Sequence, residues 1–399
     1  MTFLLIFQTI LLLLSGIATA YILLFAIAGI FYKSPTLPPA KKLRKIAVLI
    51  PGYKEDSVIV EVAKNALIQD YPSNQFDVVI IADSFQPETI LKLQELPIKV
   101  IEVKFEKSTK SKALNKAMEI LPEIYEIAVV LDADNVMAPD FLSQVNASFD
   151  TGFQVVQGHR TAKNQNNHWA ILDSISEEIN NHIFRKGHRV LGLSSAIIGS
   201  GMAFQYSFFK TLMANVFAVG GFDKEIELKM LKQGITIEYL DQAHVYDEKV
   251  QETEVFGNQR RRWLSAQIHY FRFGILDSIK DLFLRGNLDY FDKAFQFIQP
   301  PRVLLLGGTG VLTFIFTSID LFLYHSIQFS RNWLALFATI CMALIISIPA
   351  SFFNGKSLQA LAGLPKGIWV MFLSFMKIKG ANKTFIHTKH TTSSTSNNQ

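Results

Sequence analysis

The sequence has a single cysteine, Cys341, so neither a disulfide within the chain nor a cysteine-ligated metal site can form. Only 18% of its 399 residues are charged and 49% are hydrophobic, which argues against an entirely soluble protein. The net charge of +5 is modest and suits contact with anionic lipid at least as well as binding to nucleic acid. No Gly-x-Gly-x-x-Gly pattern follows the first predicted strand, which argues against a dinucleotide-binding enzyme.

Three runs of apolar residues are long enough to cross a bilayer, which takes about 20 residues of helix. They cover residues 3–32, 303–324 and 333–353. The first could instead be a cleaved signal peptide, since Ala18 and Ala20 resemble a cleavage site. However, no positive charge precedes it and it continues well past Ala20, so we expect residues 1–32 to be a retained membrane anchor. Residues 303–354 are expected to form two further transmembrane helices.

Lysine and arginine residues are concentrated on one side of these runs. The basic linker 33–44 follows the first run, Lys356 and Lys366 follow the third, and only Arg331 lies in the loop between the second and third. By the positive-inside rule, residues 33–302 and the C-terminal end face the cytoplasm. We therefore expect an integral membrane protein, in the bacterial inner (cell) membrane.

Two further segments mix apolar and charged residues in the manner of helices that lie at a membrane surface. They are residues 276–302 and 355–390. The tail 391–399 contains only small or amide side chains and is expected to be disordered. Asp320 interrupts the second apolar run, and the sequence leaves open whether it is functional or lies near an interface.

Between residues 45 and 275, short β-rich runs alternate with helical stretches. Nearly continuous apolar runs, as in buried parallel strands, occupy residues 46–50, 76–81, 98–103 and 127–131. Helical patterns lie between them at 57–69, 87–95 and 110–121. This alternation predicts an α/β domain with a mainly parallel sheet. In such sheets ligands bind beyond the carboxyl ends of the strands, which is where Asp83 and Asp132 fall.

Asp132-Ala133-Asp134 directly follows the fourth predicted strand. Residues two apart in extended chain point to the same side, so both carboxylates can face one cation. Hard cations such as Mg²⁺ take oxygen ligands, often one or two carboxylates together with substrate phosphates. We therefore expect Mg²⁺ or Mn²⁺ at Asp132 and Asp134. The alternative is an acidic loop before the next helix, whose start is suggested by Pro139-Asp140.

Six short motifs between residues 45 and 270 occur in the order found in family 2 glycosyltransferases. They are Val48-Leu49-Ile50-Pro51-Gly52-Tyr53-Lys54-Glu55, Ile80-Ile81-Ala82-Asp83, Lys110-Ser111-Lys112-Ala113-Leu114-Asn115, Asp132-Ala133-Asp134, Gly199-Ser200-Gly201-Met202-Ala203-Phe204 and Gln259-Arg260-Arg261-Arg262-Trp263. The chain resembles the membrane-integrated, processive members of this family and is similar to cellulose, hyaluronan and poly-N-acetylglucosamine synthases. The resemblance implies a GT-A-like, Rossmann-type nucleotide-sugar domain and a UDP-sugar donor.

The resemblance also implies roles for residues outside the acidic motif. Pro51, Tyr53 and Glu55 would belong to a nucleotide-binding loop, Asp83 would contact uridine, and Gly201 would lie on the acceptor side. For Asp83 the alternative is a cap on the turn that follows it.

Gln259, Arg262 and Trp263 are spaced so that they share one face of a helix. On that face the arginine can neutralise a departing diphosphate and the tryptophan can stack on a sugar ring. A basic helix that rests on lipid headgroups is the alternative. Lys110 can reach a phosphate, or it is a solvated residue at the start of a helix.

Sugar transfer with inversion needs a carboxylate that takes the proton of the acceptor hydroxyl. The family places this base in a Glu-Asp pair that opens a helix, and Asp223 occupies the matching position. Phe222 stands where the family has Glu, a departure that puts the acceptor type in doubt. Asp223 could instead be an N-cap residue, and Glu225 and Glu227 are expected to be charges on the helix surface. Tyr246-Asp247-Glu248 also recurs in the family, but no role follows for it.

Together these expectations describe a membrane-bound inverting glycosyltransferase that moves a sugar from a nucleotide-sugar to a glycan or lipid acceptor, with processive β-polysaccharide synthesis as one form. Two alternatives remain. One is a non-processive transferase that glycosylates a lipid, because only two expected spans follow the domain. The other is a catalytically inactive membrane scaffold with the same fold. The expected partners are the donor, the acceptor and membrane lipid, and no nucleic acid.

Overall fold

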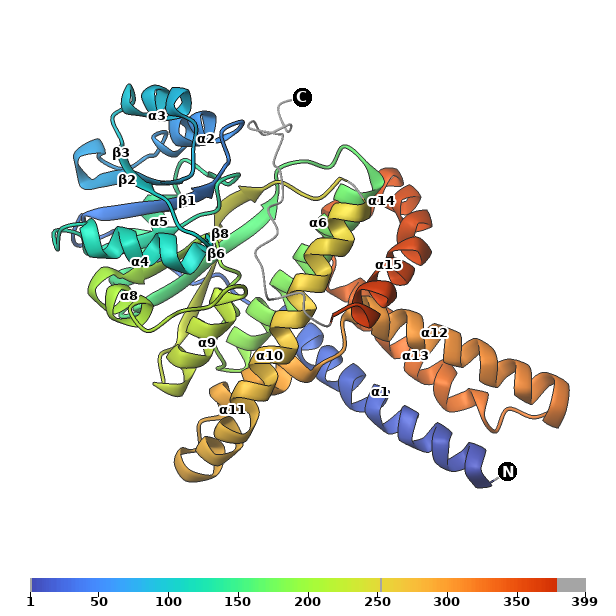
Figure 1. Ribbon diagram of the computed structural model, residues 1–399. Coiled ribbons are helices and arrows are strands. Elements are labelled where there is room, and N and C mark those ends of the chain that lie inside the picture. Colours follow the sequence, from blue (N-terminus) through green and yellow to red (C-terminus); the bar gives the residue numbers. More distant parts are fainter. Residues whose placement is uncertain (1, 252, 379–399) are drawn as a thin grey trace.

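The computed structural model describes residues 2–251 and 253–378, in which an eight-stranded sheet forms the centre of an α/β domain (Figure 1). Its strands are β1 (Ile46–Tyr53), β2 (Phe76–Asp83), β3 (Lys99–Val103), β4 (Ile127–Val130), β5 (Val136–Met137), β6 (Val155–Ala162), β7 (Met202–Gln205) and β8 (Ile237–Asp247). The order across the sheet is β3-β2-β1-β4-β7-β6-β8-β5. The first four of these strands are parallel, whereas β7 is antiparallel to both its neighbours and β5 is antiparallel to β8.

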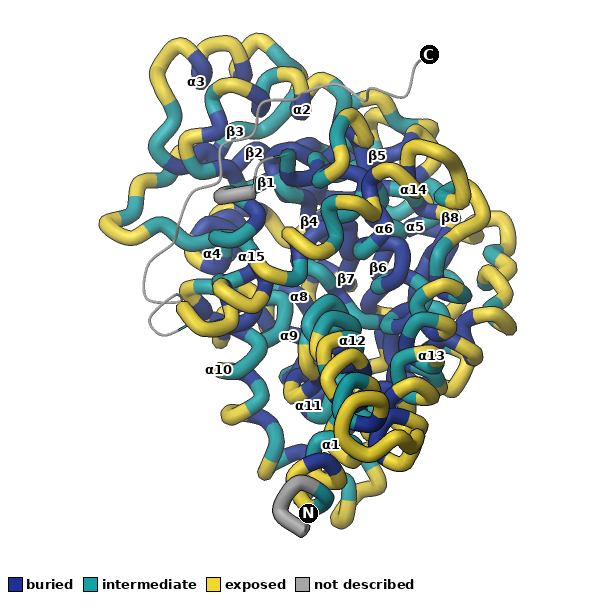
Figure 2. The backbone as a smooth tube through the Cα atoms, turned by 90° about the vertical axis from the view of Figure 1, so that its right-hand side faces the viewer, coloured by how far each residue is buried: buried dark blue, intermediate teal, exposed yellow. Residues whose placement is uncertain are grey.

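Apolar side chains of the central strands fill a core on each face of the sheet. In β1, Ala47 and Leu49 join one core, while Ile46, Val48 and Ile50 join the other, as the two-residue period of a strand requires. Helices α4 (Lys110–Ile120), α8 (Tyr206–Met213) and α9 (Phe222–Lys232) cover the first core, and α2 (Ile59–Ala66) and α5 (Phe141–Phe149) cover the second. Because both faces are covered, the central strands are largely dark blue in Figure 2.

The α/β domain with a mainly parallel sheet that the sequence predicts is confirmed. Strands β1 to β4 lie on the four predicted apolar runs, and α2, α3 (Pro87–Gln94) and α4 lie in the predicted helical stretches. Strands β6 and β8 were not predicted. Polar residues interrupt both of them, for example His159 and Arg160 in β6 and Asp241 in β8, so neither reads as a continuous apolar run.

Helix α6 (His168–Asn181) continues through a π-helical segment (His182–Gly187) into α7 (His188–Val190), and α1 (Thr2–Ile30) packs against the π-helical segment. Gly187 permits this close approach, since a Cβ at its position would lie 2.2 Å from the carbonyl oxygen of Phe25. His182 Nε2 lies 2.8 Å from the carbonyl oxygen of Ala26, and the Tyr21 hydroxyl donates to Asp292 at 2.9 Å. Specific contacts therefore hold the second half of α1 to the rest of the chain.

Helix α10 (Thr253–Arg285) is continuous over 33 residues, so the domain boundary expected at residue 275 falls inside it. Gly286, with a φ of +68°, ends the helix and lets α11 (Leu288–Ile298) fold back against it. The expected surface segment 276–302 is thus partly an extension of the helix that carries Gln259, Arg262 and Trp263.

Within the described residues, three helical stretches are long and apolar enough to cross a membrane: Leu5–Ile30, Arg302–Tyr324 and Gly355–Met376. The first two coincide with expected spans and include α1 and α12 (Arg302–Ile319). The third expected span forms α13 (Ser330–Ile346), which is shorter because Pro349 follows closely. Gly355–Met376, expected at the membrane surface, contains α14 (Gly355–Ala360) and α15 (Leu364–Met376). The expected disordered tail 391–399 lies outside the described residues.

These apolar helices fall into two groups. Figure 1 shows α1, α12 and α13 side by side and pointing away from the sheet, and α13 contacts both α1 and α12. In contrast, α14 packs on α6, and α15 packs on α10 and on α12. The outer parts of α12 and α13 are largely exposed, as their yellow stretches in Figure 2 show.

Asp320 closes the turn between α12 and α13. Its buried carboxylate accepts hydrogen bonds from the backbone N–H groups of Phe329 at 3.0 Å and Ser330 at 2.7 Å, and from the Ser330 hydroxyl at 2.7 Å. These N–H groups belong to the first turn of α13 and would otherwise lack partners. The contacts give Asp320 a structural role in the turn.

Candidate active site

Three carboxylates come together beyond the carboxyl ends of the strands. Asp132 and Asp134 follow β4, and Asp247 is the last residue of β8. One carboxylate oxygen from each residue lies within 4.8 Å of the other two. We call Asp132, Asp134 and Asp247 the acidic group. Three oxygen ligands at this separation suit a hard divalent cation.

Asn135 links the members of the acidic group. Its Nδ2 donates to Asp134 Oδ1 at 3.2 Å and to Asp247 Oδ1 at 3.0 Å. Its Oδ1 accepts from the backbone N–H of Asp132 at 3.2 Å. The backbone N–H of Glu248 donates to Asp134 Oδ2 at 3.2 Å. Such hydrogen bonds behind the carboxylates hold their orientation, as partners of metal ligands commonly do.

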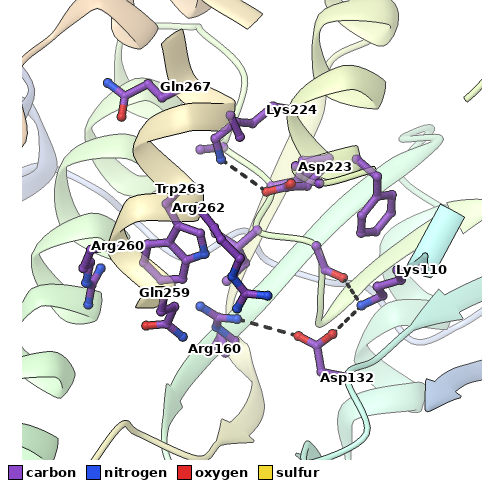
Figure 3. Close-up of a pocket in the computed structure, with 18 of the residues that line it drawn as sticks. Lys110, Asp132, Arg160, Asp223, Lys224, Gln259, Arg260, Arg262, Trp263 and Gln267 are labelled. Atoms are coloured by element: carbon purple, nitrogen blue, oxygen red, sulfur yellow. Dashed lines mark hydrogen bonds and ion pairs between the residues drawn. The ribbon is translucent and has the colours of Figure 1, made fainter. Parts of the chain in front are cut away.

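Several cations lie beside the acidic group, and Figure 3 shows two of them, Lys110 and Arg160, next to Asp132. Lys110 Nζ lies 2.5 Å from Asp132 Oδ1, and Lys249 Nζ lies 2.9 Å from Asp247 Oδ2. Arg160 Nη1 lies 4.0 Å from Asp132 and 3.9 Å from Asp247. Burial alone would raise the pKa of Asp247, but Arg160 and Lys249 outweigh it and hold this pKa below its ordinary value. Asp247 is therefore ionised at neutral pH, as a metal ligand must be.

The acidic group lies in the wall of a cavity of about 580 Å³. Nearly every side chain singled out in the sequence lines the same cavity: Pro51, Tyr53, Glu55, Asp83, Lys110, Asp132, Asp134, Asp223, Gln259, Arg262 and Trp263. They come from β1 and the loop after it, the ends of β2 and β4, the starts of α4 and α9, and α10. Polar groups that converge on one concavity from separate elements are typical of a ligand site.

Gly201 is the exception, because it does not line the cavity. It is buried immediately before β7 with a φ of +62°, and its carbonyl oxygen accepts from the backbone N–H of Gly158 at 2.7 Å. Gly199, two residues earlier, does line the cavity, and its carbonyl oxygen accepts from Lys110 Nζ at 2.8 Å. This motif therefore lines the cavity at Gly199, before the chain enters β7.

Asp223 is the second residue of α9, and Gly221 takes the N-cap position, so Asp223 is not the N-cap residue. Lys224 Nζ lies 3.5 Å from Asp223 Oδ2 (Figure 3). The neighbouring Phe222 is buried in the core beside the sheet, with Lys110 Nζ 5.3 Å from the centre of its ring. The position of the family's Glu is therefore filled by an apolar side chain.

Glu227 differs from the expected surface charge. It is buried, its Oε1 lies 3.0 Å from Lys293 Nζ of α11, and it accepts from the backbone N–H of Ile197 at 3.1 Å. Burial raises the pKa of Glu227. Glu225 is partly exposed and pairs with Lys229 at 2.5 Å. The Glu227–Lys293 pair thus fastens α11 to α9 along the cavity, which both residues line.

Gln259, Arg262 and Trp263 lie on the side of α10 that lines the cavity, as their spacing predicts (Figure 3). Desolvation lowers the pKa of Arg262. Trp263 is 39% exposed, so part of its ring is open to a ligand. Arg260 is buried, forms an ion pair with Asp173, and has its Cζ 4.4 Å from the centre of the Trp263 ring. Both partners of Arg260 line the same cavity.

Several charged residues of the cavity were not singled out in the sequence, and four of them lie close to the acidic group or belong to it: Arg160, Glu177, Asp247 and Lys249. Sequence reasoning could have found Asp247, because it belongs to Tyr246-Asp247-Glu248, a stretch that recurs in the family, and because it ends a strand. The other three form a buried cluster, in which Glu177 lies 3.0 Å from Arg160 and 3.8 Å from Lys249. These three residues lie on different elements of the chain, so no local pattern marks them.

Comparisons with known proteins agree with this geometry. The family model described as "Glycosyltransferase like family 2" matches residues 44–266, more than half of the chain. The mannosyltransferase PcManGT from Pyrobaculum calidifontis, solved in complex with GDP-Man and Mn²⁺, is similar over 85% of this chain and 98% of its own, with a TM-score of 0.52 and 17% identity. At that identity the likeness supports the fold alone.

A curated relative is more similar over a shorter stretch. The beta-monoglucosyldiacylglycerol synthase of Nostoc sp. (strain PCC 7120 / SAG 25.82 / UTEX 2576) is 32% identical over 106 residues, which are 25% of this chain. The match spans only 22% of that protein's length. The family match, by contrast, extends from just before β1 into α10 and includes the whole acidic group. The chain therefore belongs to glycosyltransferase-like family 2, and it is a glycosyltransferase with a GT-A-like fold.

Proposed function

We propose that the chain is a membrane-bound, inverting glycosyltransferase that moves a sugar from a nucleotide-sugar donor to a glycan or lipid acceptor, with Asp223 as the base. One observation carries the proposal. A single cavity contains the acidic group and Asp223 and continues to Arg302, where the apolar helix α12 begins. A donor bound at the acidic group and an acceptor that arrives beside α12 would meet inside one enclosure, which supplies the proximity that transfer needs.

The donor nucleoside is assigned to the loops after β1 and β2. Pro51, Tyr53, Glu55 and Asp83 line this part of the cavity. The adjacent residues Lys54 and Ser84 have φ values of +55° and +59°, unusual for residues with side chains, and the backbone N–H of Lys54 donates to the carbonyl oxygen of Asp83 at 3.1 Å. Strained backbone of this kind gathers at ligand sites. UDP remains the expected nucleotide.

Asp132, Asp134 and Asp247 are the residues that would hold Mg²⁺ or Mn²⁺. They fit such an ion because all three offer oxygen, Asn135 orients them, and lysine and arginine supply the balancing charge in this structure. When bound, the ion neutralises negative charge on the departing diphosphate. Arg262 adds a second positive charge, made more effective because it is desolvated. Lys110 is placed to exchange its contact with Asp132 for one with a phosphate oxygen.

Asp223 takes the proton of the acceptor hydroxyl while the hydroxyl oxygen attacks the anomeric carbon of the donor. The new bond joins these two atoms. The bond from the anomeric carbon to the diphosphate oxygen breaks, and its electron pair leaves with the nucleoside diphosphate. Attack from the side opposite the leaving group converts an α-linked donor into a β-linked product.

The proposal is tested with full-length protein in detergent and a panel of labelled UDP- and GDP-sugars. With Mg²⁺ or Mn²⁺ we expect release of nucleoside diphosphate from at least one donor. Chelation of the metal or the substitution Asp132→Asn should reduce the rate at least about 100-fold. Asp140→Asn is the matched control, because Asp140 is exposed and outside the cavity. If the metal-loaded protein turns over no donor, the proposal fails and the inactive scaffold is the better reading.

A single transfer to a lipid is the second candidate. It is favoured because the cavity ends at the linker between α11 and α12, at the base of the apolar helices. Sizing the product distinguishes the two forms, since one sugar per acceptor indicates single transfer and a ladder indicates processive synthesis. The positive charges of residues 33–44 support a cytoplasmic position for the site.

A further inference from the structure

We infer that the acceptor carries a phosphate group beside its reacting hydroxyl, and that Arg302, together with Arg185 and Arg260, binds this phosphate. We call these three arginines the arginine end of the cavity. The inference rests on the proposed function and deepens it by naming the acceptor class, a lipid whose headgroup has both a phosphate and a free hydroxyl.

Arg302 is held in a defined place on the cavity wall. It is the first residue of α12, and its Nη2 donates to the carbonyl oxygen of Ser176 at 3.1 Å and to Asn180 Oδ1 at 2.7 Å. Its Cζ lies 5.5 Å from the centre of the Phe184 ring. All of these partners are neutral. Among the described residues no carboxylate pairs with Arg302, and its Nη1 is buried without a hydrogen-bond partner.

Neighbouring groups add to the positive charge. Arg260 and Arg185 both repel Arg302, while Glu177 attracts it. Arg260 is matched by Asp173, but Arg185 shares Glu177, at 3.7 Å, with two other cations. The arginine end therefore has more cations than carboxylates, an excess that folding alone would not favour.

Other buried polar atoms here also lack partners. Arg260 Nε and Gln299 Oε1 have no hydrogen bond, although both side chains line the cavity and are more than nine-tenths buried. Buried polar groups in folded proteins nearly always have partners, and an unpaired charged donor is especially costly. The donors Arg302 Nη1 and Arg260 Nε call for an acceptor such as a phosphate oxygen, whereas the acceptor Gln299 Oε1 calls for a donor such as a hydroxyl. A ligand with both groups would supply these hydrogen-bond partners.

The chemistry of the ligand follows from these groups. A guanidinium with an unused N–H edge matches phosphate, and the N-terminus of α12 at the same place also favours an anion. The donor's diphosphate is already accounted for by the acidic group and Arg262. Apolar residues lie beside the arginines, since Phe297, Pro301 and Val303 line the same end. A phosphate attached to a lipid satisfies both features.

The test compares two short-chain lipids with a free hydroxyl, phosphatidylglycerol and diacylglycerol, in equilibrium binding to full-length protein in detergent. We expect phosphatidylglycerol to bind at least about tenfold more tightly. Arg302→Gln should weaken its binding by about 10- to 100-fold, and Arg302→Lys, which keeps the charge and loses the planar fork, by less. Arg331→Gln is the matched control, because Arg331 is exposed in the first turn of α13 and lies outside the cavity. It should change binding less than about twofold.

Donor hydrolysis is measured on the same preparations, because it reports the proposed function and correct folding without an added acceptor. Hydrolysis retained in Arg302→Gln together with lost phosphatidylglycerol binding supports the inference. Equal affinities for the two lipids, or equal effects of Arg302→Gln and Arg331→Gln, overturn it while the proposed function stands. Soluble glycerol 3-phosphate that binds as tightly as phosphatidylglycerol, and through Arg302, overturns the lipid part. Absence of donor hydrolysis in the unmodified protein overturns the proposed function and this inference with it.

Discussion

Asp132, after β4, and Asp247, at the end of β8, bring carboxylate oxygens within 4.8 Å of each other although two other strands separate β4 from β8 in the sheet. The loop after β4 therefore reaches across the ends of β7 and β6 to complete the acidic group. Asn135, in that loop, donates a hydrogen bond to the Asp247 carboxylate. The site forms only when both halves of the sheet are folded.

This relationship makes Asp247 testable as a metal ligand. Asp247→Asn should raise the metal concentration for half-maximal donor turnover by at least about tenfold, because one charged oxygen ligand is lost. A metal titration of turnover measures the shift. Asp241→Asn, on the same strand and outside the cavity, should leave the titration unchanged. Identical titrations for Asp247→Asn and the unmodified protein would exclude Asp247 as a ligand.

Asp223 should govern the chemical step rather than donor binding. Asp223→Asn is expected to lower kcat for transfer by about 10²–10⁴-fold while donor affinity stays the same, since a general base acts only in the transition state. Glu225→Gln is the control two residues further along α9. Retention of more than about a tenth of kcat by Asp223→Asn would show that another group takes the proton.

Restoring the family's Glu-Asp pair should harm this protein. Phe222 is 7% exposed and packs in the core beside the sheet, so Phe222→Glu removes apolar contacts and buries a carboxylate. We expect a loss of roughly 3–5 kcal/mol in the free energy of unfolding, against roughly 1 kcal/mol for Phe222→Leu. Thermal unfolding in detergent ranks the variants. A Phe222→Glu protein as stable as the unmodified one would show that this position tolerates the family's residue.

One ion-pair cluster at the start of β2 predicts a pH-dependent stability. Burial would raise the pKa of Asp77 in β2, but hydrogen bonds from Tyr125, Lys99 and Lys45 outweigh it and lower this pKa. Because the folded pKa is depressed, the stabilisation is present above the unfolded value of about 3.9 and is lost as pH falls through the folded pKa.

Asp77→Asn should accordingly lower the unfolding temperature at pH 7, by an amount that corresponds to roughly 1 kcal/mol, and the difference should shrink below pH 4. Melting curves of both proteins across this range provide the measurement. Glu119→Gln, in an exposed pair with Lys116, should show almost no difference at either pH. A constant gap between Asp77→Asn and the unmodified protein would argue against a titrating carboxylate.

The sequence predicted those elements of the fold that depend on a pattern of neighbouring residues. The apolar runs at β1 to β4 and the helices between them have the periodicities of buried strands and amphipathic helices, and their carboxyl ends correctly located the cavity. Strand β8 has polar residues along its length, because Glu238 pairs with Arg189, Asp241 pairs with Lys186 and Asp247 lines the cavity. Periodicity therefore missed this strand and Asp247 with it. Glu227 looked like a surface charge because its partner, Lys293, comes from a distant helix. Gly201 does not line the cavity whereas Gly199 of the same motif does, and a motif alone does not show where a chain turns inward.

For the proposed membrane-bound enzyme, the turn that Asp320 closes has a consequence for insertion into a bilayer. One carboxylate satisfies amide groups at the start of α13 that would otherwise be unpaired, so that α12 and α13 would be inserted together as a preassembled hairpin. Substitution of Asp320 is therefore expected to lower the yield of inserted protein. The turnover rate of the molecules that are inserted correctly should stay the same.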